Sequence, residues 1–339
     1  MRLNNNATVC LVLLIFAIGT GALFAQDYQA KIDALTQKIE DLSNQMSEVS
    51  DKTTYDTLLE EFNSLTKERQ ELIGQVTAEQ DKESQAKIAF NKGGSLLKQR
   101  KYDEAVAEFD KAIAIDAKYG KAYYMKGYAL TRLKRYAEAA QSYEKVLEIN
   151  PGDSKAIFAL GKLYEAQGEG KKAISLYEKA LEADPGNAKA AYSIGAVYVG
   201  WDAYTNAVDA FNKAVNIDST YDLAYTGLGT SLLELGKVGE AVDKLKKAIS
   251  LDPKNNDSYY RLAKAYNSTG QYSDALTAAD KAIQLARRSK SLKAAGSIEK
   301  GNALEGLGRK SEAKAAFQQA AQYDKKWKEW VDHHIEQMQ

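Results

Sequence analysis

Histidine and cysteine, the side chains that most often supply catalysis or bind transition metals, are scarce in this sequence of 339 residues. The two histidines, His333 and His334, are adjacent, so a helix would point them about 100° apart rather than toward one metal ion. The single cysteine, Cys10, lies in an apolar N-terminal run. The sequence contains no glycine-rich phosphate loop, nucleophile elbow or metal-ligand motif. We therefore expect no enzymatic activity, no metal and no other cofactor.

A second pattern suits binding better than catalysis, because it combines lysine with an aromatic residue. Four lysines recur at intervals of 34 residues, each followed three positions later by an aromatic ring: Lys87 and Phe90, Lys121 and Tyr124, Lys155 and Phe158, Lys189 and Tyr192. Residues three apart share one face of a helix. Lysines attract carboxylates and rings accept apolar side chains, so this face would suit an extended acidic peptide. The alternative is that the rings serve packing and the lysines are merely solvated.

The charge of the chain is divided between two regions. Lys and Arg balance Asp and Glu at 46 each. Residues 26–85, however, carry a net charge of −8, and residues 86–339 carry +7. A nucleic-acid binder would need a concentrated basic excess, so no nucleic-acid partner is expected. A hydrophobic content of 45% is normal for a folded protein and argues against global disorder.

The interval of 34 residues organises the basic region. Alanine returns at this interval, with a final step of 38: Ala105, Ala139, Ala173, Ala207, Ala241, Ala275 and Ala313. The three prolines, Pro151, Pro185 and Pro253, share one register. Each copy holds two amphipathic stretches of about 13 residues around a polar turn, which predicts a pair of helices. Small residues allow the two helices to cross closely, and proline ends the second one. Such pairs need stacked neighbours to bury a core.

This arrangement resembles the tetratricopeptide repeat family over residues 86–327. The resemblance implies an all-α, right-handed solenoid of seven helix pairs with a concave face lined by the first helices. The units are expected at 86–119, 120–153, 154–187, 188–221, 222–255, 256–289 and 294–327. Four extra residues, 290–293, should lengthen the first helix of the last unit by one turn. Residues 328–339 predict an amphipathic helix that caps the solenoid, with partner docking as the alternative.

The resemblance also places the lysine and aromatic positions. In the family geometry, the second and fifth residues of each first helix project into the concave groove. The predicted partner-binding residues are therefore Lys87, Phe90, Lys121, Tyr124, Lys155, Phe158, Lys189, Tyr192 and Tyr260. Packing between repeats remains the alternative for the rings. The clamp by which chaperone-tail-binding members hold a terminal carboxylate is not matched, because Asp257, Ala196 and Gly227 occupy positions that it needs.

The acidic residues 26–85 have the apolar spacing of a coiled coil. Seam positions follow one another at steps of three and four in two runs: Ile32, Leu35, Ile39, Leu42, Met46 and Val49, then Leu58, Phe62, Leu65, Leu72 and Val76, with Arg69 at the one seam position of the second run that is not apolar. The pattern predicts two helices, the second starting at a capping box of Thr53 and Asp56. Each narrow seam needs a partner. The helices therefore form an antiparallel hairpin within one chain or, as the sequence slightly favours, a bundle between chains.

Residues 1–25 predict a secretory signal peptide. Arg2 precedes an apolar run from Val9 to Phe24, and Ala25 precedes a polar segment. An uncleaved membrane anchor is the alternative. Cleavage would leave a chain without cysteine and without a second apolar run long enough to span a membrane, so no membrane partner is expected afterwards.

The sequence thus predicts an exported, periplasmic scaffold or adaptor that holds protein partners or extended acidic peptides in a concave groove. Residues 26–85 would allow it to form a homo-oligomer. The alternative is a purely structural subunit of a cell-envelope or flagellar assembly that associates through the coiled-coil segment.

Overall fold

A computed structural model describes residues 20–287 and 289–338 of the chain, and all regular elements in these ranges are helices. The chain divides into two compact units, residues 1–129 and 130–339, with the division inside helix α5. In the described part, no helix is both long and apolar enough to cross a membrane. Residues 1–19 of the predicted signal peptide lie outside the described residues.

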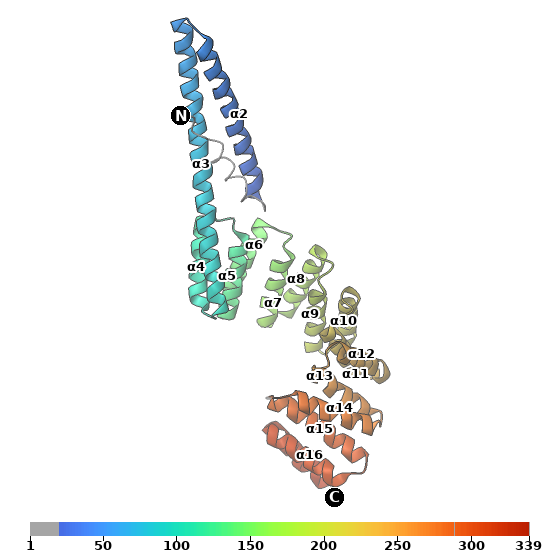
Figure 1. Cartoon of the computed structure of the whole chain (residues 1–339). Helices are drawn as coiled ribbons and strands as arrows, with labels where there is room; N and C mark the ends of the chain where they lie inside the picture. Colours follow the sequence, from blue (N-terminus) through green and yellow to red (C-terminus); the bar gives the residue numbers. More distant parts are fainter. Residues whose placement is uncertain (1–19, 288, 339) are drawn as a thin grey trace. The chain divides into compact units, whose positions relative to one another are not determined.

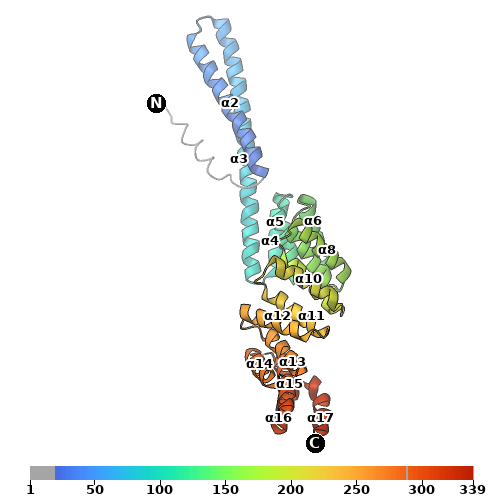
Figure 2. The same ribbon diagram turned by 90° about the vertical axis from the view of Figure 1, so that its right-hand side faces the viewer.

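The first unit begins with a helical hairpin. Helices α2 (Thr20–Glu48) and α3 (Lys52–Lys98) run antiparallel and pack against each other (Figures 1 and 2). The seam residues of α2 face this contact, since Leu35, Ile39 and Leu42 are buried. The acidic segment therefore forms the first of the two arrangements that its spacing allowed, a pair within one chain.

The start of α3 differs from the prediction. Its N-cap is Asp51, whose carboxylate accepts from the backbone N–H groups of Thr53 and Thr54, so the expected capping box at Thr53 is wrong. One acceptor at residue 51 satisfies two free N–H groups of the first turn. Helix α3 then continues through residue 85 without a break, and its last turns form the first helix of the first repeat.

The first unit also contains the start of the solenoid. Helix α4 (Tyr102–Ile115) packs against the end of α3, and α5 (Gly120–Arg132) follows. Gly93 lies directly on the ring of Phe109, where an added Cβ would come within 2.6 Å of Phe109 Cε1. Only a residue without a Cβ lets these two helices approach this closely.

The second unit contains the remaining helix pairs. The first helices α7, α9, α11 and α13 begin at the residue where the spacing predicts a new unit, and α15 begins four residues before it. Its helices are α6 (Tyr136–Ile149), α7 (Ser154–Ala166), α8 (Gly170–Ala183), α9 (Ala188–Gly200), α10 (Tyr204–Ile217), α11 (Asp222–Glu234), α12 (Val238–Leu251), α13 (Asn256–Ser268), α14 (Tyr272–Leu285), α15 (Lys290–Gly306) and α16 (Lys310–Tyr323). Pro151, Pro185 and Pro253 each stand two residues beyond a second helix, as expected for helix breakers. Helix α15 has 17 residues where the other first helices of this unit have 13, which confirms the predicted extra turn.

Packing in the second unit places the first helices together. Helix α11 touches both α9 and α13, and α13 touches α15, while each second helix packs between consecutive first helices. Small residues repeat at the crossings: an added Cβ at Gly195 would come within 2.7 Å of Phe211 Cε1, and one at Gly301 within 2.3 Å of Phe317 Cε1. The first helices α9, α11, α13 and α15 therefore line one continuous surface.

The C-terminal end of the second unit is covered by a helix. After a short 3₁₀ turn, Lys325–Trp327, helix α17 (Lys328–Gln337) packs on α16. Val331 is buried in a cluster that includes Ala313 and Phe317, with Ile335 at its edge. This packing is the capping role predicted for residues 328–339.

Candidate functional site

The candidate site is the surface formed by α7, α9, α11 and α13 of the second unit. Side chains at the starts of these helices hold neighbours in register. Asn187 caps α9 by accepting from the Ala190 N–H, and its amide lies 3.5 Å from Ser154 Oγ of α7. Asn255 caps α13 in the same way and donates to Thr226 Oγ1 of α11 at 3.3 Å. The capping residues thus fix how the first turns of adjacent helices align.

Two lysines stand in these first turns. Lys155 on α7 and Lys189 on α9 are both exposed, and among the described residues neither has a hydrogen-bond or ion-pair partner. Lys162 lies two turns further along α7 and differs from these lysines, because its Nζ lies 2.9 Å from the Glu165 carboxylate. The two first-turn lysines therefore offer charge that no other group of the described structure neutralises.

The aromatic residues of the predicted ladder are packed as well as partly exposed. The Phe158 ring lies 5.4 Å from the Tyr177 ring, and the Tyr192 ring lies 5.5 Å from Phe211 and 5.2 Å from Tyr221. Each ring thus contacts both helices of its own repeat. Tyr192 also contacts Tyr221, which lies just before helix α11. Phe158 and Tyr192 are half-buried. These contacts are of the kind that the packing alternative describes, and part of each side chain remains exposed.

A shallow pocket of about 210 Å³ opens beside Tyr192. Two of its lining residues, Ala196 and Gly227, are small. Gly227 cannot carry a side chain, since a Cβ there would come within 2.6 Å of Phe211 Cζ. The pocket is lined by Tyr192, Ala196, Val199, Phe211, Leu223, Thr226, Gly227, Thr230, Asn255, Asp257 and Arg261.

Polar side chains of this pocket form hydrogen bonds with one another or with an adjacent residue. Thr226 Oγ1 and Ser258 Oγ are buried at 2.7 Å from each other, and Arg261 Nε donates to Asp257 Oδ2 at 2.8 Å. Burial raises the pKa of the Tyr192 hydroxyl, with the carboxylate of Asp257 acting in the same direction. The hydroxyl therefore remains a neutral donor at any physiological pH.

Tyr260 lies on α13, one helix beyond the other rings of this unit. Burial raises the pKa of its hydroxyl, and the Glu299 carboxyl of α15 adds to this effect. Glu299 is itself buried and accepts from the side-chain amide of Asn267 at 2.9 Å. Tyr260 thus adjoins a buried polar cluster rather than the two first-turn lysines.

The other predicted residues belong to the first unit. Lys87 on α3 and Lys121 on α5 are exposed, while Phe90 and Tyr124 are half-buried. The Phe90 ring lies 5.7 Å from Phe109 and 5.1 Å from Tyr119, the same packing seen for Tyr192. The repeat thus reproduces one ring arrangement in both units.

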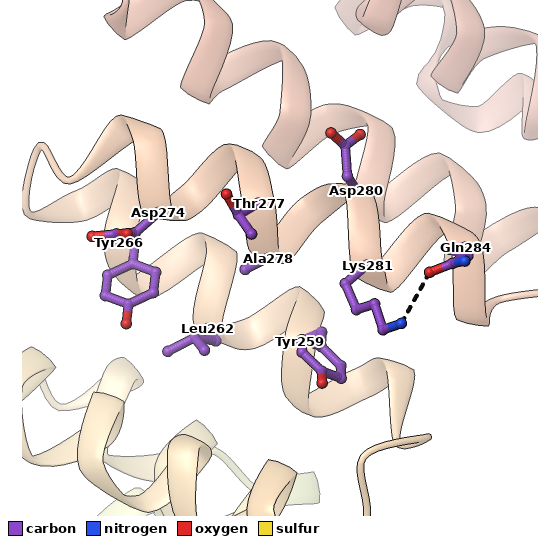
Figure 3. Close-up of a pocket in the computed structure, with 9 residues that line it drawn as sticks. All are labelled: Tyr259, Leu262, Tyr266, Asp274, Thr277, Ala278, Asp280, Lys281 and Gln284. Carbon is purple, nitrogen blue, oxygen red and sulfur yellow. Dashed lines mark hydrogen bonds between the residues drawn. The ribbon is translucent and has the colours of Figure 1, made fainter.

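A larger open pocket of about 640 Å³ lies on α13 and α14 (Figure 3). It is lined by Tyr259, Leu262, Tyr266, Asp274, Thr277, Ala278, Asp280, Lys281 and Gln284. Lys281 donates to Gln284 at 3.0 Å, and Asp280 pairs with Lys300 at 2.7 Å, so two of its charged groups already have partners. Over the described ranges, no three His, Cys, Asp or Glu side chains are placed to hold a metal ion.

Comparison with known families defines the class of protein. Family models described as tetratricopeptide repeat or TPR repeat match residues 75–154, 130–196, 188–221, 229–270, 257–289 and 297–326. The chain belongs to the tetratricopeptide repeat family. Members of this family bind protein or peptide partners.

Solved structures with a TM-score above 0.5 share the fold of this chain. The C-terminal part of a TPR repeat-containing protein from Cytophaga hutchinsonii is 20% identical, covers 69% of this chain and 95% of its own, and has a TM-score of 0.56. A tetratricopeptide repeat protein from Parabacteroides merdae is 19% identical, with coverages of 75% and 99% and a TM-score of 0.54. MamA is 28% identical over 52% of this chain and 94% of its own, with a TM-score of 0.46. A comparison with curated proteins returns no match.

Sequence reasoning did not find the pocket beside Tyr192. Its signal was the pair of small residues, Ala196 and Gly227, at inward positions of adjacent first helices. In the sequence these two residues were noted only because they do not match the carboxylate clamp of the chaperone-tail-binding members. At Gly227 the space that a Cβ would need is filled by the ring of Phe211, which lies in a different helix.

Proposed function

We propose that this protein is an exported scaffold or adaptor that holds an extended acidic segment of a partner protein along its first helices. The proposal rests on two exposed lysines without partners in the described structure, Lys155 and Lys189. They lie on the same helices as the partly exposed rings of Phe158 and Tyr192. Carboxylates of the partner would meet the lysines, and apolar side chains would meet the rings and the pocket.

The positions of the lysines support an anionic partner. Both stand in the first turn of a helix, where the free N–H groups and the helix dipole already create positive potential. A cation there is unfavourable for the isolated chain. A bound carboxylate would offset this cost, which favours binding of an anionic segment.

A charge-reversal variant tests the groove. In Lys155→Glu/Lys189→Glu, two attractions become two repulsions, each worth about 0.5 kcal/mol at an exposed site. The sum is about 2 kcal/mol, or roughly a 30-fold loss of affinity. A fluorescent ten-residue peptide of alternating Glu and Leu, titrated against the full chain and followed by anisotropy, measures it.

A matched variant separates this effect from net charge. Lys171 and Lys179 are exposed on the second helix α8. Lys171→Glu/Lys179→Glu makes the same change in total charge away from the proposed surface and should bind almost as well as the unaltered chain. Equal affinities of the two double variants would refute the groove. Binding that does not weaken with added salt would also contradict it.

The export and assembly of the protein belong to the same proposal. Residues 1–25 would direct the chain to the periplasm, and N-terminal sequencing of the protein from the periplasmic fraction should begin near Gln26. An intact N-terminus in the membrane fraction would support an anchor instead. Residues 26–85 would bring chains together, so that one assembly presents more than one groove.

A further inference from the structure

The second residue of each first helix from α7 to α13 changes in type along the chain. These four residues are Lys155 on α7, Lys189 on α9, Leu223 on α11 and Asp257 on α13. The two lysines are exposed and have no partner among the described residues, whereas the Asp257 carboxylate accepts from Arg261 Nε at 2.8 Å. The surface therefore offers free positive charge on two helices, then an exposed leucine, then a charge that is already paired.

Leu223 forms one side of the pocket beside Tyr192. It is 45% exposed, although its side chain is apolar. The pocket has a volume of about 210 Å³, and Val199 and the buried ring of Phe211 line it together with Leu223. Small-molecule ligands occupy pockets of about 300–1,000 Å³. The smaller volume and the apolar lining fit one side chain of a longer partner rather than a separate ligand.

The distance between neighbouring first helices sets the step along this surface. Helix α11 touches both α9 and α13, and the side-chain amide of Asn187 at the start of α9 lies 3.5 Å from Ser154 Oγ at the start of α7. The axes of helices in contact are about 8–10 Å apart. A partner that meets one first helix after another must therefore present a side chain about every 8–10 Å, on the same side each time.

Two extended conformations cover this distance with three residues, but only one keeps the side chains on one side. Three residues of a β-strand span about 10 Å, and because successive side chains alternate, residues three apart point to opposite faces. Three residues of a polyproline II helix span about 9 Å and complete one turn, so residues three apart point to the same face. The spacing of the first helices thus favours a partner in the polyproline II conformation.

The rings on this surface suit the same conformation. A polyproline II segment has no internal hydrogen bonds, and aromatic-lined grooves are surfaces that recognise it. Phe158 and Tyr192 are half-buried and follow Lys155 and Lys189 by three residues on the same helices. The Tyr192 hydroxyl has no hydrogen-bond partner among the described residues, so it is free to donate to a backbone carbonyl of the partner.

We propose that the partner segment binds in the polyproline II conformation and carries two acidic residues and one large apolar residue, in this order, at steps of three. The two carboxylates meet Lys155 and Lys189, and the apolar side chain enters the pocket beside Leu223. The pattern ends there, because Asp257 and Arg261 already pair with each other. This inference rests on the proposed function and adds the order, the spacing and the conformation of the partner's residues.

Two peptides of the same composition test the spacing. The reference is Glu-Ser-Ser-Glu-Ser-Ser-Leu, and the shifted form is Glu-Ser-Ser-Glu-Ser-Leu-Ser. Both ends are blocked, and binding of a fluorescent label to the full chain is followed by anisotropy. The shift should weaken binding about ten-fold, the effect of burying about half of a leucine side chain. The spacing is the same in either chain direction, so the reversed pair is also measured, and the tighter direction decides.

A proline peptide tests the conformation. Glu-Pro-Pro-Glu-Pro-Pro-Leu keeps the three-residue step and adopts polyproline II before it binds. It should therefore bind at least as tightly as the serine reference, because less conformational freedom is lost on binding. A ten-fold weaker affinity for the proline peptide would overturn the proposed conformation.

Leu223→Lys tests the pocket through a change of preference. The unaltered chain should bind the reference peptide about ten-fold more tightly than Glu-Ser-Ser-Glu-Ser-Ser-Glu. In Leu223→Lys, helix α11 presents the same residue as α7 and α9, so this preference should be reversed. Leu235→Lys makes the same change at a 38% exposed leucine directly after α11, about 18 Å along the helix axis, and should keep the original preference. Circular dichroism should show the same helix content in all three proteins.

The remaining outcomes separate this inference from the proposed function. Equal affinities for the reference and shifted peptides, together with weaker binding by Lys155→Glu/Lys189→Glu, would refute the spacing and leave the proposed function intact. An unchanged preference in Leu223→Lys would refute the pocket as the apolar site. Failure of every acidic peptide to bind the unaltered chain would refute both.

Discussion

Two adjacent glycines in α3 allow the contribution of a close helix crossing to stability to be measured. An added Cβ at Gly93 would come within 2.6 Å of Phe109 Cε1 and 2.9 Å of Cδ1 and Cζ. At Gly94 nothing lies within 4 Å of that position. Both residues are inside the same helix, so Gly93→Ala and Gly94→Ala share the change in helix propensity and differ only in what the new methyl group meets.

The magnitudes follow from these contacts. Replacing Gly by Ala inside a helix stabilises it by about 1 kcal/mol. Forcing a methyl group against a buried ring costs about 1–3 kcal/mol, because Phe109 is fully buried and its neighbours must shift. Gly94→Ala should therefore stabilise α3, and Gly93→Ala should be less stable than Gly94→Ala by about 1–3 kcal/mol.

Local hydrogen exchange is the suitable assay, because a repeat array need not unfold in a single step. The free energy of opening is measured from the exchange of the α4 amides, which pack on Gly93. A second pair in the other unit repeats the test: an added Cβ at Gly195 would come within 2.7 Å of Phe211 Cε1, while Gly200 of the same helix has open space. Equal protection in the two members of both pairs would refute the reasoning.

Two further predictions concern buried groups of the second unit. Burial raises the pKa of the Glu299 carboxyl, against the opposing hydrogen bond from Asn267. The folded state then holds the proton more tightly than the unfolded state, so stability falls as pH rises from the unfolded to the folded pKa. Glu299→Gln should raise Tm at pH 8 but not at pH 4, and an equal shift at both would contradict this. Val331→Ala should cost about 2 kcal/mol, since it removes two buried carbons. Exchange in α17 should then accelerate, and unchanged exchange would argue against the cap.

The repeat architecture could be predicted from the sequence because each rule that governs it is local or periodic. Alanine and glycine at fixed intervals mark helix crossings, and proline marks the end of a second helix. The four extra residues before the last unit predicted the longer α15. The 34-residue spacing also predicted the positions of Lys155 and Lys189 in their helices, because α7 and α9 begin at residues 154 and 188, as the spacing requires.

The candidate site could be predicted only in part. Spacing placed Phe158 and Tyr192 on one face, but the division of each ring between packing and exposure depends on Tyr177 and Phe211 in other helices. Beside Tyr192, the close approach of Gly227 to the ring of Phe211 likewise joins two different helices. A single sequence does not show such pairs, because the two members lie more than ten residues apart and each has an ordinary local role.

The sequence alone determined that this chain forms helix pairs with a period of 34 residues, and that its acidic segment forms helices with narrow apolar seams. Both follow from the hydrophobic spacing, which a helix of 3.6 residues per turn converts directly into faces. The tertiary structure decided how those faces are used. It joined the acidic segment to the first repeat through one helix and paired α2 with α3 inside the chain. It also left Tyr55 and Ile73 of α3 exposed, because one helix can bury only one side of another.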